Sequence, residues 1–170
     1  MEKLKKDQRG LTMIELVMVI AATALIAGSL TMTIMNMFNT NLRASNHMAA
    51  VSQVEHVGFW VSPDVQMALS VNASGGLGFP LTLTWVEGGT TNVHEVIYTL
   101  EDMPGGLKRL QREHYIESEL DSTIVVAEYI DPFQTSCVWG SGKLTFTVTA
   151  TVGAQSETRE YEIKPRPGSY

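Results

Sequence analysis

One ionisable residue lies at the start of a long apolar stretch of this chain. Glu15 is the only acidic residue in residues 11–38, and that stretch has no Lys, Arg or His. About 20 residues of helix cross the hydrocarbon core of a bilayer, so the stretch is long enough to span one. A charge within hydrocarbon costs from about 3 to more than 10 kcal/mol, which makes Glu15 a candidate functional residue. A buried carboxylate is tolerated when a positive group pairs with it and donates hydrogen bonds.

The residues leave three interpretations of this stretch open. A cleaved secretory signal has an apolar core of only about 7–15 residues, so the stretch is too long for one. A plain single-pass anchor fits the length, with Glu15 reaching back to water at headgroup depth. In the third interpretation the span is also an assembly surface, on which a partner's positive charge neutralises Glu15. Basic residues before the span, Lys3, Lys5, Lys6 and Arg9, favour a cytoplasmic N-terminus.

The residues around Glu15 resemble the N-terminal motif of type IV pilin-like proteins, which include pilins and the pseudopilins of type II secretion and of competence. That motif is a short basic leader, Gly, an apolar residue, usually Thr, two apolar residues and Glu, directly before a long apolar helix. The matching residues are Arg9, Gly10, Leu11, Thr12, Met13, Ile14 and Glu15. The match covers about 30 residues and is specific in its spacing.

The resemblance implies a processing site and an assembly site. A membrane prepilin peptidase would cut after Gly10 and methylate the new terminus at Leu11, a position where Phe is commoner. Glu15 would then pair with the N-terminal amine of a neighbouring subunit. The implied partners are other pilin or pseudopilin subunits, the prepilin peptidase, an inner-membrane assembly platform and, before assembly, membrane lipid. The implied location is the inner (cytoplasmic) membrane, crossed once with the C-terminal domain outside the cytoplasm, and then a pilus or pseudopilus.

Charge and composition exclude one class of partner. The chain has 170 residues and a net charge of −6. The leader contributes four basic and two acidic residues, so the processed chain carries about −8. No basic cluster lies outside the leader, so we expect no direct nucleic-acid binding.

The remaining reactive side chains do not form a motif for catalysis. The four histidines, His47, His56, His94 and His114, show no metal-binding spacing. We expect Cys137, the only cysteine, to be a buried apolar residue, and it cannot form an intramolecular disulfide. Acidic residues at 113, 117, 119 and 121 are expected to form a solvated connector rather than a calcium site. We therefore predict no enzyme, no cofactor and no metal.

The periodicity of the sequence predicts an α+β fold. Apolar residues at helical spacing continue the N-terminal helix, and residues 62–64 look like its boundary. Residues 65–71 are expected to form a short second helix or a kinked continuation, and residues 72–78 a Gly-rich loop. Strand alternation then predicts about six antiparallel strands, at residues 81–86, 93–100, 107–115, 123–130, 144–151 and 157–163.

These elements divide the chain into four parts. We expect a leader at residues 1–10 and a transmembrane half of the helix at 11–38. An amphipathic half, with the possible second helix, follows at 39–71, and an antiparallel β-rich domain at 79–170. We therefore expect a pilin-like architecture, in which the amphipathic half of the long helix packs its apolar face on the sheet.

Two segments resemble J-type minor pseudopilins and W-type minor pilins. One contains Phe59, Trp60 and Asp64; the other places a strand with Tyr98 before the strand of residues 107–112. The alternative for Tyr98 and Arg109 is ordinary sheet packing and a solvated strand face. The sequence thus predicts a minor pilin or pseudopilin, with an unprocessed membrane-anchored binding or sensor protein as the alternative. It leaves open which filament the chain enters and whether it lies at a tip.

Overall fold

The computed structural model describes residues 12–89 and 91–165. The predicted cleavage site at Gly10 and Leu11 lies outside the described residues. The chain divides into two compact units, with the boundary between Leu42 and Arg43. The long helix α1 (Met13–Met67) contributes to both units.

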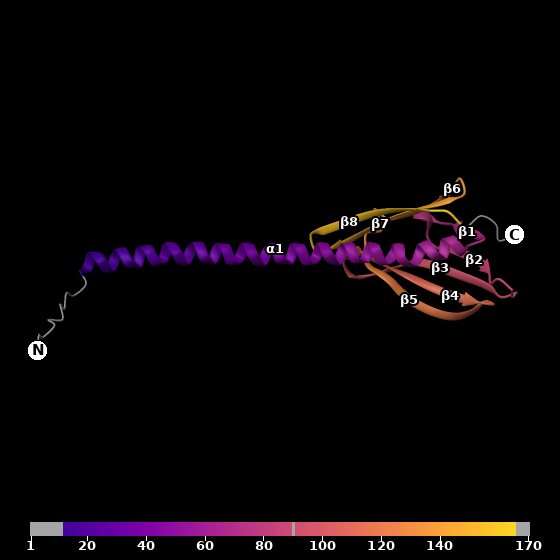
Figure 1. The fold of residues 1–170 in the computed structure, drawn as a ribbon, viewed down its shortest axis with the longest axis horizontal. Coiled ribbons are helices and arrows are strands. Elements are labelled where there is room, and N and C mark those ends of the chain that lie inside the picture. The colour runs from indigo at the N-terminus through magenta and orange to yellow at the C-terminus, as the bar shows by residue number, and fades with distance from the viewer. Residues whose placement is uncertain (1–11, 90, 166–170) are drawn as a thin grey trace, which may run out of the picture. The chain divides into compact units, whose positions relative to one another are not determined.

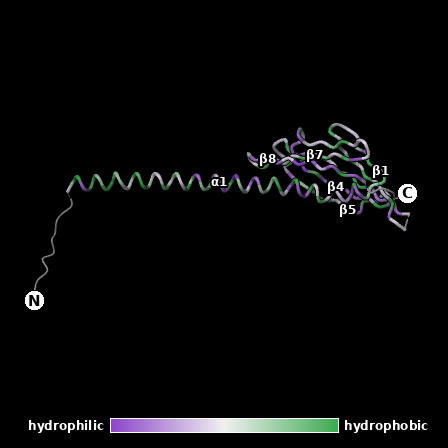
Figure 2. The backbone as a smooth tube through the Cα atoms, turned by 45° about the horizontal axis from the view of Figure 1, so that its top comes forward, coloured by the Kyte–Doolittle hydropathy of each residue, from purple (hydrophilic) through white to green (hydrophobic). Residues whose placement is uncertain are grey.

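The first part of α1 has no packing partner in its own unit. Every residue from 12 to 45 is exposed, although most of them are apolar. Figure 2 shows hydrophobic residues recurring along this part of the helix. By length and composition α1 could cross a membrane. The helix that the sequence predicts at residues 11–38 is confirmed from Met13 onward.

The second part of α1 is amphipathic and packs on the sheet. Its buried residues recur at intervals of three and four, which places them on one face of the helix. They are Ala50, Val54, Val57, Gly58, Val61, Asp64 and Val65. Figure 1 shows β7 and β8 along one side of this part of the helix and β3, β4 and β5 along the other.

The helix continues through the boundary that the sequence predicts at residues 62–64. Pro63 lies inside α1 on its exposed side, and Asp64 and Val65 beyond it are buried. Packing of this last turn on the sheet outweighs the hydrogen bond that a proline removes. Of the two alternatives for residues 65–71, the second helix is wrong, and the continuation of the first helix holds only as far as Met67, since Ser70 already begins a strand.

In the part of the chain that the structure describes, eight strands and two 3₁₀ turns follow the helix. Their bounds are β1 (Ser70–Ala73), η1 (Gly76–Gly78), β2 (Leu81–Val86), β3 (Val93–Asp102), η2 (Pro104–Gly106), β4 (Lys108–Ile116), β5 (Glu119–Ile130), β6 (Ser136–Gly140), β7 (Lys143–Val152) and β8 (Gln155–Ile163). The α+β class, with a long N-terminal helix on an antiparallel sheet, is therefore confirmed.

The strands form one antiparallel sheet in the order β1-β2-β3-β4-β5-β7-β6, and β8 pairs with β7. Strands β5 and β7 pair only at Ile130 and Ala150. Strand β7 pairs with β8 along its length and with β6 over its first half. Alternate residues of β7 are buried, including Leu144, Phe146 and Val148, so this strand lies at the centre of the core.

Two strands that the sequence analysis missed are short. β1 occupies the start of the predicted loop at 72–78, and β6 contains the buried Cys137, whose predicted burial is confirmed. Position 78 of this loop requires glycine, because its φ is +81° and a Cβ there would collide with the carbonyl oxygen of Cys137. The acidic connector is also corrected, since Glu119 begins β5 and the segment is a β-hairpin.

Candidate functional site

Glu15 closes a capping box at the start of α1. The backbone N–H of Thr12 donates to Glu15 Oε2 over 2.9 Å, and the Thr12 hydroxyl donates to the same oxygen over 2.8 Å. In return the Glu15 N–H donates to Thr12 Oγ1 over 3.3 Å. Thr12 is thus the N-cap residue and Glu15 the third helical residue, the spacing of a capping box.

This geometry gives Glu15 a partner within its own chain. The first backbone N–H groups of a helix have no acceptor inside the helix, and the box satisfies two of them. The negative carboxylate also lies at the positive end of the helix dipole. The sequence contained this signal as Thr12-x-x-Glu15, which the sequence analysis interpreted only through the pilin resemblance. Among the predicted site residues, Glu15 is the one that the structure describes.

A second polar cluster joins the end of α1 to the sheet. Arg112 of β4 donates to Asp64 of α1 through two nitrogens, from Nε to Oδ2 over 2.7 Å and from Nη2 to Oδ1 over 3.1 Å. The Tyr98 hydroxyl of β3 donates to Oδ2 of the same carboxylate over 2.5 Å. Trp60 covers the guanidinium, with its ring centroid 5.4 Å from Cζ of Arg112.

Burial makes this cluster strong and costly to disturb. Tyr98 is fully buried, and Asp64 and Arg112 are only 4% and 8% exposed. Burial and the Asp64 charge raise the pKa of Tyr98 well above its usual value. Burial lowers the pKa of Arg112, but the hydrogen bond and charge of Asp64 more than offset it and leave the pKa raised. Tyr98 and Arg112 therefore keep their protons over the ordinary pH range.

The cluster brings together the two segments for which the sequence predicts a likeness to minor subunits. The first segment contributes Trp60 and Asp64, and the second contributes Tyr98 and Arg112. Tyr98 and Asp64 both belong to the segments named from the sequence, but the contact between them was not predicted. Because the partners lie 34 and 48 residues apart, no local spacing reveals the contact.

Two of the four histidines lie together beyond this cluster. His94 Nδ1 is 3.1 Å from His114 Nε2, and His114 Nδ1 is 3.0 Å from Asp121 Oδ2. The two imidazoles and the Trp85 indole are nearly parallel, with ring centroids 5.3–5.9 Å apart. Glu87 Oε2 lies 3.8 Å from His94 Nε2. The rings fill the same face of the sheet that α1 covers further along.

The described residues contain no metal centre among these groups. No set of three His, Cys, Asp or Glu side chains within residues 12–89 and 91–165 is placed to hold a metal ion. In the acidic hairpin, Glu117 accepts a hydrogen bond from the Val93 N–H, and Glu113 accepts one from the Tyr115 hydroxyl. With Asp121 beside His114, these carboxylates have hydrogen-bond partners in strands β3 and β4.

Comparison of the chain with protein-family models, with curated proteins and with solved structures finds no match.

Proposed function

We propose that this chain is a structural subunit of a type IV pilin-like filament, a minor pilin or pseudopilin. It is cut after Gly10 by a prepilin peptidase and waits in the inner membrane with its C-terminal domain outside the cytoplasm. It then enters the filament through the apolar part of α1. The proposal rests mainly on one observation, a carboxylate at Glu15 in the first turn of an exposed apolar helix.

The exposed helix supports assembly as well as anchoring. Apolar side chains are exposed around the whole circumference of α1 as far as Phe38. Lipid covers such a surface before assembly, and equivalent helices of other subunits cover it in a filament core. The polar Thr31, Thr33 and Asn36 in its later turns suit packing between helices, where polar side chains find partners.

Glu15 has two roles in this proposal, and the structure indicates how to separate them. The carboxylate caps α1 through Thr12, and its charge pairs with the N-terminal amine of a neighbouring subunit. A glutamine at the third helical position can still complete a capping box but carries no charge. Glu15→Gln therefore removes the pairing alone, whereas Glu15→Ala removes both roles.

The experiment compares variants expressed in the native cell in place of the wild-type chain. The fraction of each variant in sheared filaments is measured against the fraction in the membrane. We expect Glu15→Gln and Glu15→Ala to insert into the membrane normally and to be depleted from filaments.

Thr12→Val is the matched control, since it removes the cap and keeps the charge. Losing an N-cap costs about 0.5–2 kcal/mol of helix stability, so this variant should still assemble. Normal filament incorporation of Glu15→Gln would refute a role for the charge. Failure of Thr12→Val together with normal Glu15→Gln would assign Glu15 to capping alone.

An unprocessed membrane-anchored binding protein is the second candidate. The capping box favours it, because Thr12 gives the carboxylate a partner that requires no second subunit. This candidate predicts that the native chain keeps its leader and that no fraction of it appears in filaments. It also predicts equal behaviour of Glu15→Gln and wild type.

A further inference from the structure

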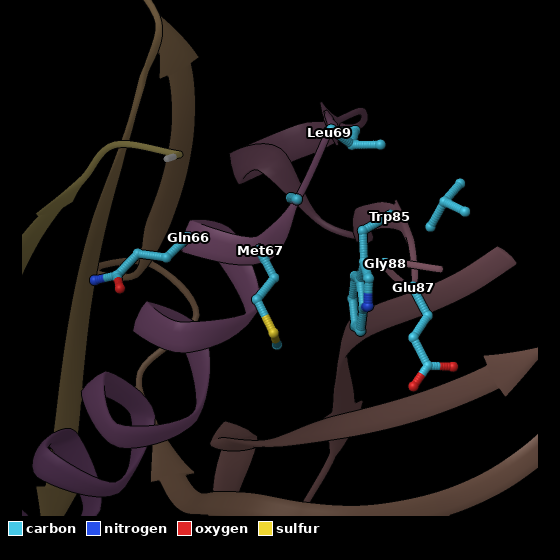
Figure 3. Close-up of a pocket in the computed structure, with 8 residues that line it drawn as sticks. Gln66, Met67, Leu69, Trp85, Glu87 and Gly88 are labelled. Atoms are coloured by element: carbon cyan, nitrogen blue, oxygen red, sulfur yellow. The ribbon is translucent and has the colours of Figure 1, made fainter. Parts of the chain in front are cut away.

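A pocket lies where α1 ends beside β2. It is far along the chain from Glu15. It has a volume of about 260 Å³, and its lining residues include Met67, Leu69, Trp85, Val86 and Glu87. Figure 3 shows the side chains of Met67 and Trp85 on opposite sides of the pocket, with Glu87 beside Trp85 at the rim. Nothing in the filament proposal uses this pocket.

The walls of the pocket suit an aliphatic chain that ends in a cation. Met67 provides a polarisable thioether and Trp85 an indole, the aromatic ring that attracts cations most strongly. Leu69 and Val86 are about half exposed and extend the apolar surface at its edge. Long basic side chains place their methylene stem on such a surface and keep their charged head at its rim.

The charge around the pocket is negative. The last turn of α1 contains no basic residue, and its carbonyl groups carry the negative end of the helix dipole. Glu87 adds a carboxylate whose side chain is 57% exposed. None of the described residues that line the pocket is basic.

The other charged residues of the second unit add to the negative potential around the pocket. Residues 43–165 contain fifteen acidic and seven basic side chains. Five of the basic ones already form ion pairs with carboxylates of the same unit, namely Lys108, Arg109, Arg112, Lys143 and Arg159. The unit therefore has a surplus of carboxylates and attracts positively charged partners.

We propose that this pocket docks a basic side chain, an arginine or lysine presented on the surface of a partner protein. The aliphatic stem of that residue lies between Met67 and Trp85, and its charged head lies at the helix end and Glu87. The inference does not depend on the filament role, since an anchored binding protein could use the same pocket.

The test uses the full chain in detergent micelles, labelled with 5-fluorotryptophan. The chain has three tryptophans, so Trp60→Phe, Trp85→Phe and Trp139→Phe assign the three ¹⁹F signals. The probe is a blocked Gly-Arg-Gly tripeptide, and its control is Gly-citrulline-Gly, which has the same shape without the charge. A Gly-norleucine-Gly tripeptide tests for a purely apolar occupant.

We expect the arginine tripeptide to shift the Trp85 signal in a saturable way and the two neutral tripeptides to shift it far less. Glu87→Gln should weaken arginine binding by about two- to five-fold, the range for an exposed ion pair. Glu119→Gln, which removes an equal charge from the β4–β5 hairpin, should leave the affinity unchanged.

Three results would overturn the proposal. The first is no saturable shift at Trp85, and the second is equal binding of the arginine and norleucine tripeptides, which would make the pocket an apolar one. The third is an equal loss of affinity in Glu87→Gln and Glu119→Gln, because then only the net charge of the unit would matter.

Discussion

Replacing Asp64 by asparagine should destabilise the second unit severely. The substitution keeps the size of the side chain but leaves the Arg112 guanidinium buried without a counter-charge. The two side chains are only 5% and 10% exposed. Breaking a buried ion pair by removing one partner costs about 3–5 kcal/mol, a large part of the 5–15 kcal/mol that stabilises a typical domain.

An exposed ion pair in the same sheet provides the matched control. Lys108 Nζ lies 2.6 Å from Asp102 Oδ1, as close as the buried pair, but the Asp102 side chain is 91% exposed. Exposed pairs contribute about 0–1 kcal/mol, so Asp102→Asn should lose no more than that. The two variants thus separate the effect of burial from the effect of distance.

The assay is urea unfolding of the full chain in detergent micelles, followed by tryptophan fluorescence. Trp60 reports on the cluster directly because its ring lies over Arg112. We also expect the apolar triple variant Asp64→Leu, Tyr98→Phe, Arg112→Met to lose less stability than Asp64→Asn, since it leaves no buried charge or hydroxyl unpaired. Equal losses in Asp64→Asn and Asp102→Asn would refute the reasoning.

Three further predictions concern single residues of the second unit. Tyr98→Phe should make the free energy of unfolding less dependent on pH above about pH 10. Tyr98 has a raised pKa in the folded state, so its contribution to wild-type stability is intact below about pH 10 and falls above it by about 1.4 kcal/mol per pH unit. Denaturant titrations from pH 9 to 11 should find this slope reduced in the variant. Gly58→Ala should stabilise the fold by about 1 kcal/mol in a Tyr161→Ala background, and should stabilise it less or destabilise it in the wild type, because the new Cβ would collide with the Tyr161 ring. Unfolding of the wild type, the two single variants and the double variant measures the coupling, and equal effects in both backgrounds would contradict the contact. Cys137 should resist iodoacetamide at pH 8 until the chain unfolds, since burial raises the pKa of its thiol to about 12, and rapid labelling of the folded chain by mass spectrometry would contradict its placement.

The sequence predicted the elements well because most of them have a strong local pattern. Leu81–Val86 and Lys143–Val152 alternate between apolar and polar residues, and both strands were predicted to within one residue. The end of α1 was harder to predict. Pro63 is a local reason to stop a helix, and only the burial of Asp64 and Val65 against a distant sheet explains why it continues.

The polar clusters depended on contacts that no local pattern contains. Tyr98 pairs with Arg112 across β3 and β4, and both residues point to the face that α1 covers. An arginine at an inward position of a predicted strand was a usable signal, since such a residue needs a buried partner. Strands β1 and β6 have only four and five residues, too few for alternation to stand out.

The capping box could have been predicted from local sequence but was missed. Thr12 and Glu15 have a spacing that predicts helix capping from local chemistry alone, before any resemblance is considered. The cap and the pairing of Glu15 with a neighbour are compatible, because one concerns the geometry of the helix start and the other concerns charge. The variants proposed above distinguish them.

The processing of the N-terminus is the most direct test of the central claim that this chain is a filament subunit. The measurement is the intact mass and N-terminal sequence of the protein purified from its native membranes. The account predicts a chain that begins at Leu11 and carries one added methyl group on its terminal amine. A chain that still begins at Met1 would contradict it, since no free amine would then lie near Glu15 of a neighbouring subunit.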